Sequence, residues 1–511
     1  MKVLIAVLAA GLLVGCRSAS GKESDHSSTK ALTLGINVSP FGAYEGTGPF
    51  MNLIYGSSWQ MQNSPHGGFA DMALASLDAN GWVRSLPRNS RVMRALAVPF
   101  GTGKFVCRYK GGGLIDVSGS AVSAVSKWVG QTQFTLTNSP DQPRFANLTY
   151  SVDPVNYIRD IDCRAANASP TEAFTPEFVS ALSGFSTVRV MKWQSATEAN
   201  LPVTWAKRNK PGDADYLKND GVPVELLVEA ANRADADLWV TVPWNADDEY
   251  VRNFAATVRD KLAPGHQVYV EVSNEVWNGG YAVGRQAAAE AKAEGLPPAS
   301  GSGTPGSLER YAEKTKQVMA IWSRVFAGQQ RRLVRVASFQ HVAPYFSELL
   351  LKYMDLHQSI DALATAPYFG FEITDTMSLD QIMAALPAQL AAALKQGVQQ
   401  KAIAEKYGLR YVTYEAGQTV VLPKNVQLEQ QVERDPRMYD IYRQFMLSWR
   451  SQLGDQLNLF TLSGQIGQYG GWGLVEYLGQ PEAQAPKMRA VQDFLRASKK
   501  GKVASRRTAV Q

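Results

Sequence analysis

The chain has 511 residues, of which 45% are hydrophobic and 19% are charged. That composition is typical of a globular protein, and the length allows one large domain together with a smaller one. The formal net charge is +6, and Lys and Arg residues cluster only near the C-terminus. Residues 498–511 are therefore predicted to be a basic disordered tail. Because no basic stripe with interleaved aromatic residues occurs, we expect no nucleic-acid partner.

Residues 1–15 have the pattern of a lipoprotein signal peptide. Met1 and Lys2 precede an apolar run over residues 3–14, which is too short to span a membrane as a helix but suits a signal sequence. The segment 13–16, Leu-Val-Gly-Cys, resembles the bacterial lipobox, in which the cysteine, here Cys16, is lipidated after cleavage. The alternative is an ordinary secretory signal with an incidental cysteine.

Residues 16–30 are small and polar, which predicts a flexible tether. Arg17, rather than an acidic sorting residue, follows Cys16. We therefore expect an outer-membrane lipoprotein, facing the periplasm or the cell surface, whose membrane partner is bound through the N-terminal lipid anchor.

Residues 31–84 are predicted to begin a barrel domain, with a short buried strand at 31–38. From residue 85 to 165 the pattern changes to short strand-like runs separated by turns, which is typical of an antiparallel β-sandwich. The runs lie at 91–100, 104–109, 113–117, 127–138, 145–152 and 157–163. This region holds Cys107 and Cys163, for which a disulfide and two separate buried thiols both remain open.

Residues 166–497 alternate between apolar strands and amphipathic helices. Strands are predicted at 187–193, 238–243, 268–273, 333–339, 362–366, 411–414 and 457–462, and helices lie between them. With the first strand the total is eight, which predicts an α/β protein with a (β/α)8 TIM barrel and the sandwich inserted between its first and second strands. An open doubly wound sheet is the alternative, but polar groups follow strand ends all round the set, as a barrel requires.

Two glutamates stand at the ends of predicted strands. Glu275 ends a β-branched run in Val-Tyr-Val-Glu-Val-Ser-Asn-Glu-Val-Trp-Asn (268–278), and Glu415 ends Tyr-Val-Thr-Tyr-Glu (411–415). The carboxyl ends of barrel strands meet at one face, so we expect both carboxyl groups there. A double-displacement glycosidase needs such a pair, because one acid protonates the leaving oxygen and one carboxylate attacks the sugar.

The chain also resembles clan A of the retaining glycoside hydrolases, on the Asn-Glu of the fourth strand and the Glu of the seventh. It is more closely similar to a bacterial group described as cellulose-binding or glycoside-hydrolase-like. The matching phrases are Gly-Ile-Asn at 35–37, residues 77–87, Val-Pro-Val-Glu at 222–225, residues 268–278, Ala-Pro-Tyr-Phe-Gly at 366–370 and Tyr-Glu at 414–415. The resemblance covers nearly all of the mature chain.

The resemblance implies that Glu275 is the acid/base and Glu415 the nucleophile. It further implies the substrate-binding residues: Arg189 as the cation near Glu415, Tyr368 as a donor to Glu415, Asn274 on a sugar 2-hydroxyl, Trp472 as a stacking platform, Trp277 as an apolar wall for Glu275 and Trp244 on the opposite wall. Several of these residues also have a structural interpretation. Glu275 would be only a salt-bridge partner and Glu415 a structural residue, and Arg189 would pair only with a barrel carboxylate such as Glu271. Tyr368 and Trp472 would be packing residues.

Two positions depart from the pattern of that group. Trp244 stands where relatives often carry His, and Lys192 stands where they carry an acidic residue. The sugar contacts at these positions therefore differ, and no relative's substrate transfers to this chain.

Metal and cofactor chemistry is not indicated. The five histidines show no His-Glu-x-x-His spacing, and no Gly-x-Ser-x-Gly elbow occurs. We expect no catalytic metal, and a retaining glycosidase needs no cofactor. The Gly-x-Gly-x-x-Gly at 301–306 follows no predicted strand and contains Pro305, so it is interpreted as a loop.

The sequence thus predicts a retaining glycoside hydrolase that acts on a polysaccharide or oligosaccharide, with endo-action favoured by the aromatic residues. The alternative is a non-catalytic glycan-binding lipoprotein involved in polysaccharide recognition or assembly, and a transglycosylase using the same pair is a third. The sugar, the linkage and the oligomeric state are not indicated.

Overall fold

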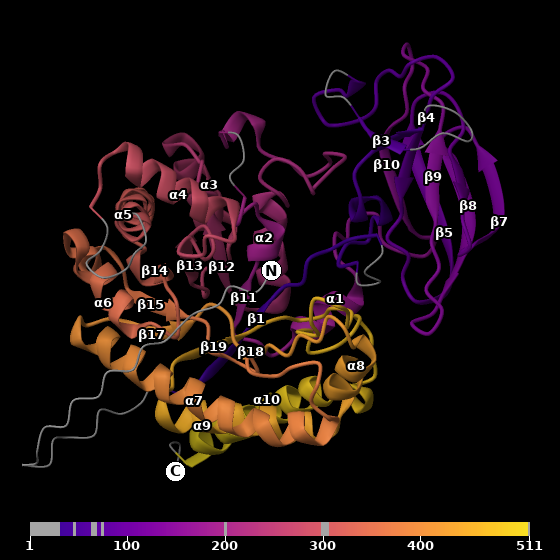
Figure 1. The fold of residues 1–511 in the computed structure, drawn as a ribbon. Helices are drawn as coiled ribbons and strands as arrows, with labels where there is room; N and C mark the ends of the chain where they lie inside the picture. Colours follow the sequence, from indigo (N-terminus) through magenta and orange to yellow (C-terminus); the bar gives the residue numbers. More distant parts are fainter. Residues whose placement is uncertain are drawn as a thin grey trace, which may run out of the picture.

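The computed structural model describes residues 31–43, 48–62, 69–72, 76–198, 202–297 and 306–508. Figure 1 shows two regions, a barrel of strands and helices and a smaller all-β region beside it. The predicted signal peptide and tether, with Cys16, lie outside the described residues, and so does most of the Gly-rich loop at 301–306.

Eight parallel strands form the barrel, in the order β17-β15-β14-β13-β12-β11-β1-β19. Their bounds are β1 (Thr33–Asn37), β11 (Thr187–Arg189), β12 (Asp237–Val242), β13 (Val268–Val272), β14 (Leu333–Ser338), β15 (Ala362–Thr365), β17 (Arg410–Thr413) and β19 (Gln456–Leu459). Asn458 on β19 bonds Thr413 on β17, with N to Oγ1 at 2.7 Å and Nδ2 to O at 3.0 Å, so the sheet nearly closes. The predicted barrel is confirmed and the open-sheet alternative is wrong.

Helices cover the outside of the barrel (Figure 1). They are α1 (Pro176–Leu182), α2 (Val224–Ala234), α3 (Asp248–Lys261), α4 (Ala282–Ala293), α5 (Ser307–Val325), α6 (Pro344–Lys352), α7 (Leu379–Lys406), α8 (Val426–Arg434), α9 (Arg437–Gln452) and α10 (Pro486–Thr508). Each turns an apolar face inward. In α3, for example, Tyr250, Phe254 and Val258 are buried, while Asp247 caps the N-terminus by accepting from the Tyr250 N–H at 2.7 Å.

Short 3-10 turns supplement the helices at η1 (Leu53–Gly56), η3 (Met191–Trp193), η4 (Trp205–Lys207), η5 (Gln330–Arg332), η6 (Tyr353–Ser359) and η7 (Glu482–Gln484). Helix α8 was not predicted, because its nine residues are too few to show a clear period. Residues 498–508, which the sequence predicts as part of a disordered tail, continue α10 in the structure. The Ala, Lys and Arg residues of that tail are good helix formers, so basic composition alone does not end the helix.

The inserted region consists of two antiparallel sheets packed around one core. One sheet has the order β10-β5-β8-β7 and the other β3-β2-β4-β9-β6. Their bounds are β2 (Gln60–Gln62), β3 (Phe69–Asp71), β4 (Arg91–Ala95), β5 (Gly101–Lys110), β6 (Asp116–Ser118), β7 (Val122–Trp128), β8 (Gln131–Asn138), β9 (Asn147–Tyr150) and β10 (Arg159–Ala165). The sandwich thus lies between β1 and β11, as predicted.

Two details of the sandwich differ from the prediction. Strands β2 and β3 pair with the β4 sheet although they precede residue 85, so the boundary at 84/85 falls inside the sandwich. Each has only three residues, too few to show alternation. Cys107 and Cys163 face each other on β5 and β10 and form a disulfide.

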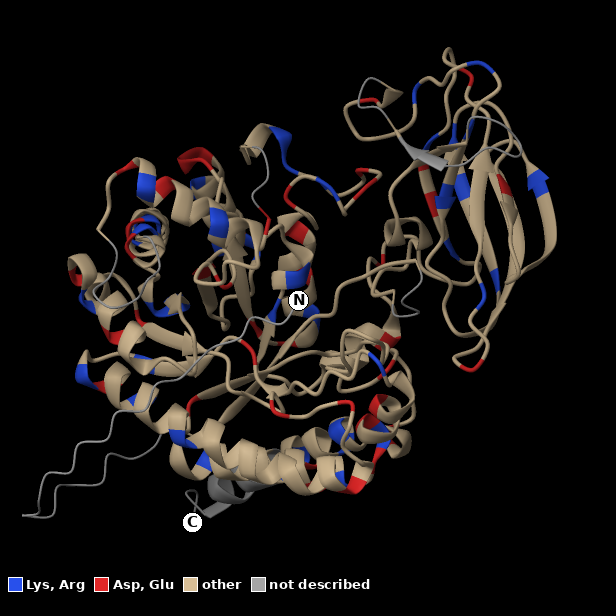
Figure 2. Ribbon diagram, viewed as in Figure 1, with Lys and Arg blue, Asp and Glu red and all other residues tan. Residues whose placement is uncertain are grey.

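Charges of both signs mix along the barrel helices (Figure 2). Within the part of the chain that the structure describes, no helix has the length and apolar character needed to cross a bilayer.

A two-stranded parallel sheet stands at the mouth of the barrel. It pairs β16 (Tyr368–Phe369) with β18 (Gly417–Gln418), so that Tyr368 lies opposite Gly417. Because Glu415 lies two residues before Gly417, this pairing brings the loops after β15 and β17 together and positions Tyr368 beside Glu415.

Candidate active site

Arg189 lies at the centre of the polar groups at the barrel mouth. It ends β11, its side chain is fully buried, and its guanidinium donates five hydrogen bonds. Two reach Glu271, at 3.2 and 2.9 Å, and single bonds reach Glu415 at 2.9 Å, Asn274 at 2.7 Å and Asn37 at 2.9 Å. The alternative in which Arg189 pairs only with Glu271 is therefore wrong.

Two carboxylates hold Arg189 in its charged form. Burial alone would lower the pKa of Arg189, but the charges of Glu271 and Glu415 outweigh it and raise that pKa above its ordinary value. Glu271 is itself fully buried and accepts further bonds from the Trp239 indole at 3.0 Å and from the Ser338 hydroxyl. Glu271 is thus a structural counter-ion beneath the mouth, whereas Glu415 lies above it.

Glu415 is held at both of its carboxylate oxygens. Oε1 accepts from Arg189, and Oε2 accepts from the Tyr368 hydroxyl at 2.8 Å. Burial, followed by the charge of Glu415, raises the pKa of Tyr368 well above its ordinary value, so the phenol keeps its proton and remains a donor. One cation and one phenol on the two oxygens is the arrangement of a carboxylate rather than of a carboxylic acid.

Glu275 has a different environment. Its Oε1 accepts from the Tyr414 hydroxyl at 3.1 Å and its Oε2 from the Asn278 amide at 3.0 Å. Burial, followed by the charge of Glu415, raises the pKa of Glu275 to about 7. Glu275 is therefore largely protonated below neutral pH, which a general acid needs.

The backbone at Glu275 is in the left-handed region, with φ of 48°, and Ser273 has φ of 56°. Residues other than glycine adopt this conformation at a cost, and such residues concentrate at functional sites. These two left-handed residues follow β13, where they turn the chain away from the strand and help direct Glu275 into the mouth. The Asn274 N–H between them donates to the Ala196 carbonyl at 2.9 Å, which fixes this turn.

An aromatic wall, defined as Tyr368, Phe460 and Trp472, borders this polar group. The Phe460 ring centroid lies 6.3 Å from that of Tyr368 and 6.2 Å from that of Trp472. Trp472 is half-buried, and its indole N–H donates to Thr419 Oγ1 at 3.3 Å. The wall packs on Met191 and Ala196, which follow β11. A half-buried indole in this wall offers an apolar face on the same side of the mouth as Tyr368.

The other two predicted tryptophans have different surroundings. Trp244 is buried, and its indole donates to Glu290 on α4 at 3.1 Å, so it fastens the helix layer instead of lining the opposite wall. Trp277 is half-buried and packs against Phe339, with ring centroids 6.5 Å apart. Burial is the largest cause of the raised pKa of Glu275, so the role of Trp277 as its apolar wall stays a prediction.

Three site residues were missed from the sequence. Tyr414 donates to Glu275, Phe460 joins the aromatic wall, and Tyr281 lies near both carboxyl groups, whose charges add to burial in raising its pKa. Tyr414 and Phe460 directly follow β17 and β19. Their position at strand ends was a usable signal, since the barrel mouth is built from such residues.

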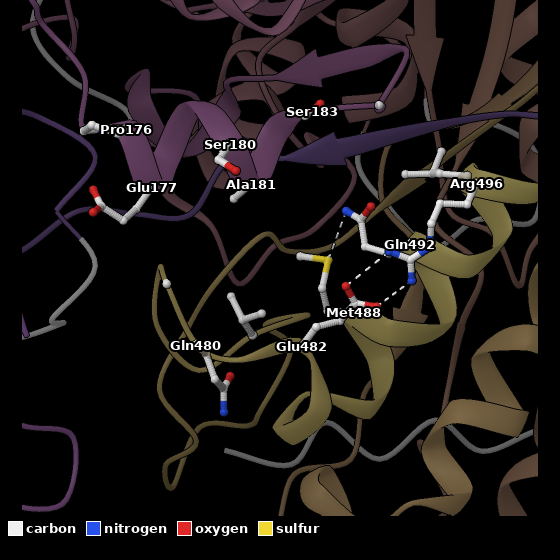
Figure 3. A pocket seen from close by; sticks show the side chains of 14 residues that line it. Pro176, Glu177, Ser180, Ala181, Ser183, Gln480, Glu482, Met488, Gln492 and Arg496 are labelled. Carbon is white, nitrogen blue, oxygen red and sulfur yellow. Dashed lines mark hydrogen bonds and ion pairs between the residues drawn. The ribbon is translucent and has the colours of Figure 1, made fainter. Parts of the chain in front are cut away.

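Two large hollows lie away from the carboxyl groups. One, of about 640 Å³, separates α1 from α10, and Figure 3 shows Met488 and Arg496 of α10 across from Ser180 and Ala181 of α1. The other, of about 1020 Å³, lies between the sandwich and the barrel and is lined in part by Phe100, Phe105, Phe174 and Tyr477. Neither is lined by Glu275 or Glu415.

No group of three or more His, Cys, Asp or Glu side chains within the described ranges is arranged to hold a metal ion. The barrel mouth itself offers a carboxyl group with a raised pKa, a carboxylate held by a cation, and an aromatic wall.

No protein-family model and no curated protein matches the chain. Among solved structures, the GH51 arabinofuranosidase of Xanthomonas axonopodis pv. citri has a TM-score of 0.41 and 12% identity over 60% of this chain, which spans 64% of that protein. The CBM22-1–GH10 modules of a Clostridium thermocellum endo-1,4-beta-D-xylanase have a TM-score of 0.37 and 9% identity. That match covers 89% of this chain and 95% of the xylanase modules. A Bacteroidetes-affiliated GH5 cellulase has a TM-score of 0.38 and 13% identity, over 65% of this chain and 87% of the cellulase.

Proposed function

We propose that this protein is a retaining glycoside hydrolase that acts on a polysaccharide or oligosaccharide. Glu275 is the acid/base and Glu415 is the nucleophile. The observation that carries the proposal is the pair of contrasting carboxyl environments at one barrel mouth. Arg189 and Tyr368 bond the two oxygens of Glu415, whereas Glu275 meets only neutral donors and has its pKa raised to about 7.

The reaction proceeds by double displacement. Glu415 attacks the anomeric carbon while Glu275 transfers its proton to the glycosidic oxygen, so the C–O bond breaks and a glycosyl ester forms on Glu415. Glu275, now a carboxylate, takes a proton from water, and the hydroxyl oxygen attacks the anomeric carbon and releases Glu415. The charge of Glu415 raises the pKa of Glu275, so esterification of Glu415 lowers that pKa and suits Glu275 to its second role as base.

The other groups support this chemistry. Arg189 and Tyr368 aim the oxygens of Glu415 and compensate its charge. Asn274, already bonded to Arg189, has its amide N–H groups available for a sugar 2-hydroxyl. Trp472 provides the face on which a sugar ring stacks.

The first test is hydrolysis of a panel of polysaccharides by the soluble chain from Ser18 onward, beside Glu275→Gln and Glu415→Gln. We expect each variant to lose at least about a hundredfold in kcat. Glu372→Gln is the matched control, because Glu372 is exposed outside the polar network and should keep full activity. NMR of the first product should show the anomeric configuration of the substrate, and early release of mixed oligosaccharides would support endo-action.

The two roles can be separated. With an aryl glycoside that has a good leaving group, Glu275→Ala should still form the glycosyl ester, and added azide should be glycosylated with retention, because azide needs no general base. Glu415→Ala should show no such rescue with retention. If a polymer is bound equally by wild type and both variants but never cut, the protein is a recognition module and the catalytic assignment fails.

We also propose that the chain is exported and anchored to the outer membrane through lipidated Cys16. The support is the N-terminal sequence together with the Cys107–Cys163 disulfide, which is favoured in oxidising compartments. Labelled palmitate should be incorporated into the full chain and not into Cys16→Ser, which should be recovered in the soluble fraction. Equal labelling of the two chains would contradict the anchor.

A further inference from the structure

Lys192 places a positive charge on the aromatic wall. It belongs to η3, directly after β11, and its side chain is exposed. Its Nζ lies 5.6 Å from the centroid of the Phe460 ring, and Phe460 packs against both Tyr368 and Trp472. Because Tyr368 bonds Glu415, the ammonium lies along the same wall that leads to the proposed nucleophile.

This charge is uncompensated within the described ranges. No carboxylate there lies within ion-pair distance of Lys192, whereas Arg189, three residues earlier, is held by Glu271 and Glu415. An exposed lysine is usually only a solvated surface charge, but this ammonium lies over the Phe460 ring at the barrel mouth. The position therefore offers a cation to whatever occupies the mouth.

A neutral sugar needs no cation at this place, whereas an anionic sugar does. A sugar carboxylate that approached the mouth would be repelled by Glu415 and by ionised Glu275, and a nearby ammonium offsets that repulsion. An aromatic wall that ends in an ammonium presents an apolar face to the ring and a point charge to the carboxylate.

We propose that Lys192 is a specificity-determining residue that binds the carboxylate of a uronic acid, so that the substrate is a uronic-acid-containing glycan. The inference rests on the proposed hydrolase function and names its substrate class. Lys192 takes no part in the bond-breaking steps, so its removal should change the choice of substrate rather than the chemistry.

The test compares polyuronates of several linkages with the same polymers after chemical reduction of their carboxyl groups to primary alcohols. Wild type, Lys192→Met and Lys395→Met are measured on each pair. Methionine keeps the length of the aliphatic stem, and Lys395, exposed on α7, gives the same change in net charge away from the mouth. Binding of each pair to Glu275→Gln, with and without Lys192→Met, gives a second measurement that is independent of turnover.

Wild type should prefer one acidic polymer to its reduced twin by about ten- to a hundredfold in kcat/KM, because a charge-assisted hydrogen bond is lost with the carboxylate. Lys192→Met should remove that preference while cleaving the reduced twin within about threefold of wild type, and Lys395→Met should match wild type. Added salt should shrink the wild-type preference.

Three results would overturn the inference. If a polymer and its reduced twin are cut equally by wild type, the hydrolase stands but Lys192 does not select uronic acids. If Lys192→Met loses activity equally on both twins, Lys192 supports the wall and not a carboxylate. If no polymer in this panel or in the neutral panel is cut or bound, the proposed function fails together with this inference.

Discussion

Arg189 shows how a single side chain organises this site. A guanidinium carries five N–H donors in a rigid fork, and all five are used here, on Glu271, Glu415, Asn274 and Asn37. A lysine has three donors and no fork, so Arg and Lys are not interchangeable at this position. The positions of the proposed nucleophile and of Asn274 therefore depend on one buried cation.

Tyr414 tunes the proposed acid. Its hydroxyl donates to Glu275, and this bond favours the ionised form and lowers the pKa of Glu275, against the larger effect of burial. The acid works only when protonated, so activity should fall as pH rises through about 7. In Tyr414→Phe the pKa of Glu275 should rise, and the alkaline limb of kcat/KM should move to higher pH by about half to one unit.

The control for this pH profile is Tyr411→Phe. Tyr411 is a buried tyrosine of β17 whose hydroxyl bonds Thr365 and not a carboxyl group, so its removal should leave the alkaline limb in place. A shift toward lower pH in Tyr414→Phe, or equal shifts in the two variants, would show that Tyr414 does not act through Glu275.

At the scale of elements, the loop between β19 and α10 depends on a buried ion pair. Lys487 in the first turn of α10 bonds Glu433 of α8 and donates to the Gly471 carbonyl at 2.6 Å. Gln418 on β18 donates to the same carbonyl at 3.0 Å. Gly471 directly precedes Trp472, so these contacts position the stacking face from outside the barrel mouth.

Lys487→Met should therefore destabilise the fold and loosen the Trp472 loop. It leaves Glu433 buried without its cation, which costs about 3–5 kcal/mol and should be measured by denaturant unfolding. In the double variant Lys487→Met/Glu433→Leu stability should largely return, since no buried charge remains. The KM of that double variant should still rise severalfold with little change in kcat, because the Gly471 carbonyl has lost a donor.

A raised KM with little change in kcat would show that the Lys487–Glu433 pair positions Trp472 and does not only stabilise the fold. If the double variant recovers both stability and wild-type KM, the ion pair stabilises the helices without positioning Trp472. Unchanged stability in Lys487→Met alone would contradict the account of the buried pair itself.

At the scale of the whole molecule, the sandwich has its own core and a covalent link of its own. The Cys107–Cys163 bond joins β5 to β10 across 56 residues, and both cysteines lie in the sandwich core, apart from the barrel core. A T-shaped contact between Phe100 and Tyr477, with centroids 4.8 Å apart, is one of the contacts between the two regions. The sandwich should therefore respond to reduction separately from the barrel.

Replacement of both cysteines by alanine should destabilise the sandwich by about 2–4 kcal/mol, because the unfolded segment gains conformational freedom. Calorimetry should show a lower melting temperature for one transition and little change in the transition of the barrel. Hydrolytic activity at 25 °C should persist, since no candidate catalytic residue lies in the sandwich. A single transition that shifts as a whole would show that the two regions unfold as one unit.

The barrel, the place of the insertion and the two candidate glutamates could be predicted from the sequence, because they depend on short-range patterns. An apolar run of four to six residues predicts a buried strand wherever it lies, and its last residue predicts a position at the mouth. Those same patterns failed where elements were short, as at β2, β3 and α8, because three to nine residues show no clear period.

Which side chains meet could not be predicted from the sequence, because it depends on contacts between residues far apart in the chain. Tyr414 bonds Glu275 across 139 residues, Arg189 joins Glu415 across 226, and Phe460 meets Trp472 on one wall with Lys192 above it. Trp244 ends buried against α4 although its place after a strand suggested a cleft wall. A strand end specifies that a residue is at the mouth, but the tilt of the barrel and the pairing of loops specify the direction in which its side chain points.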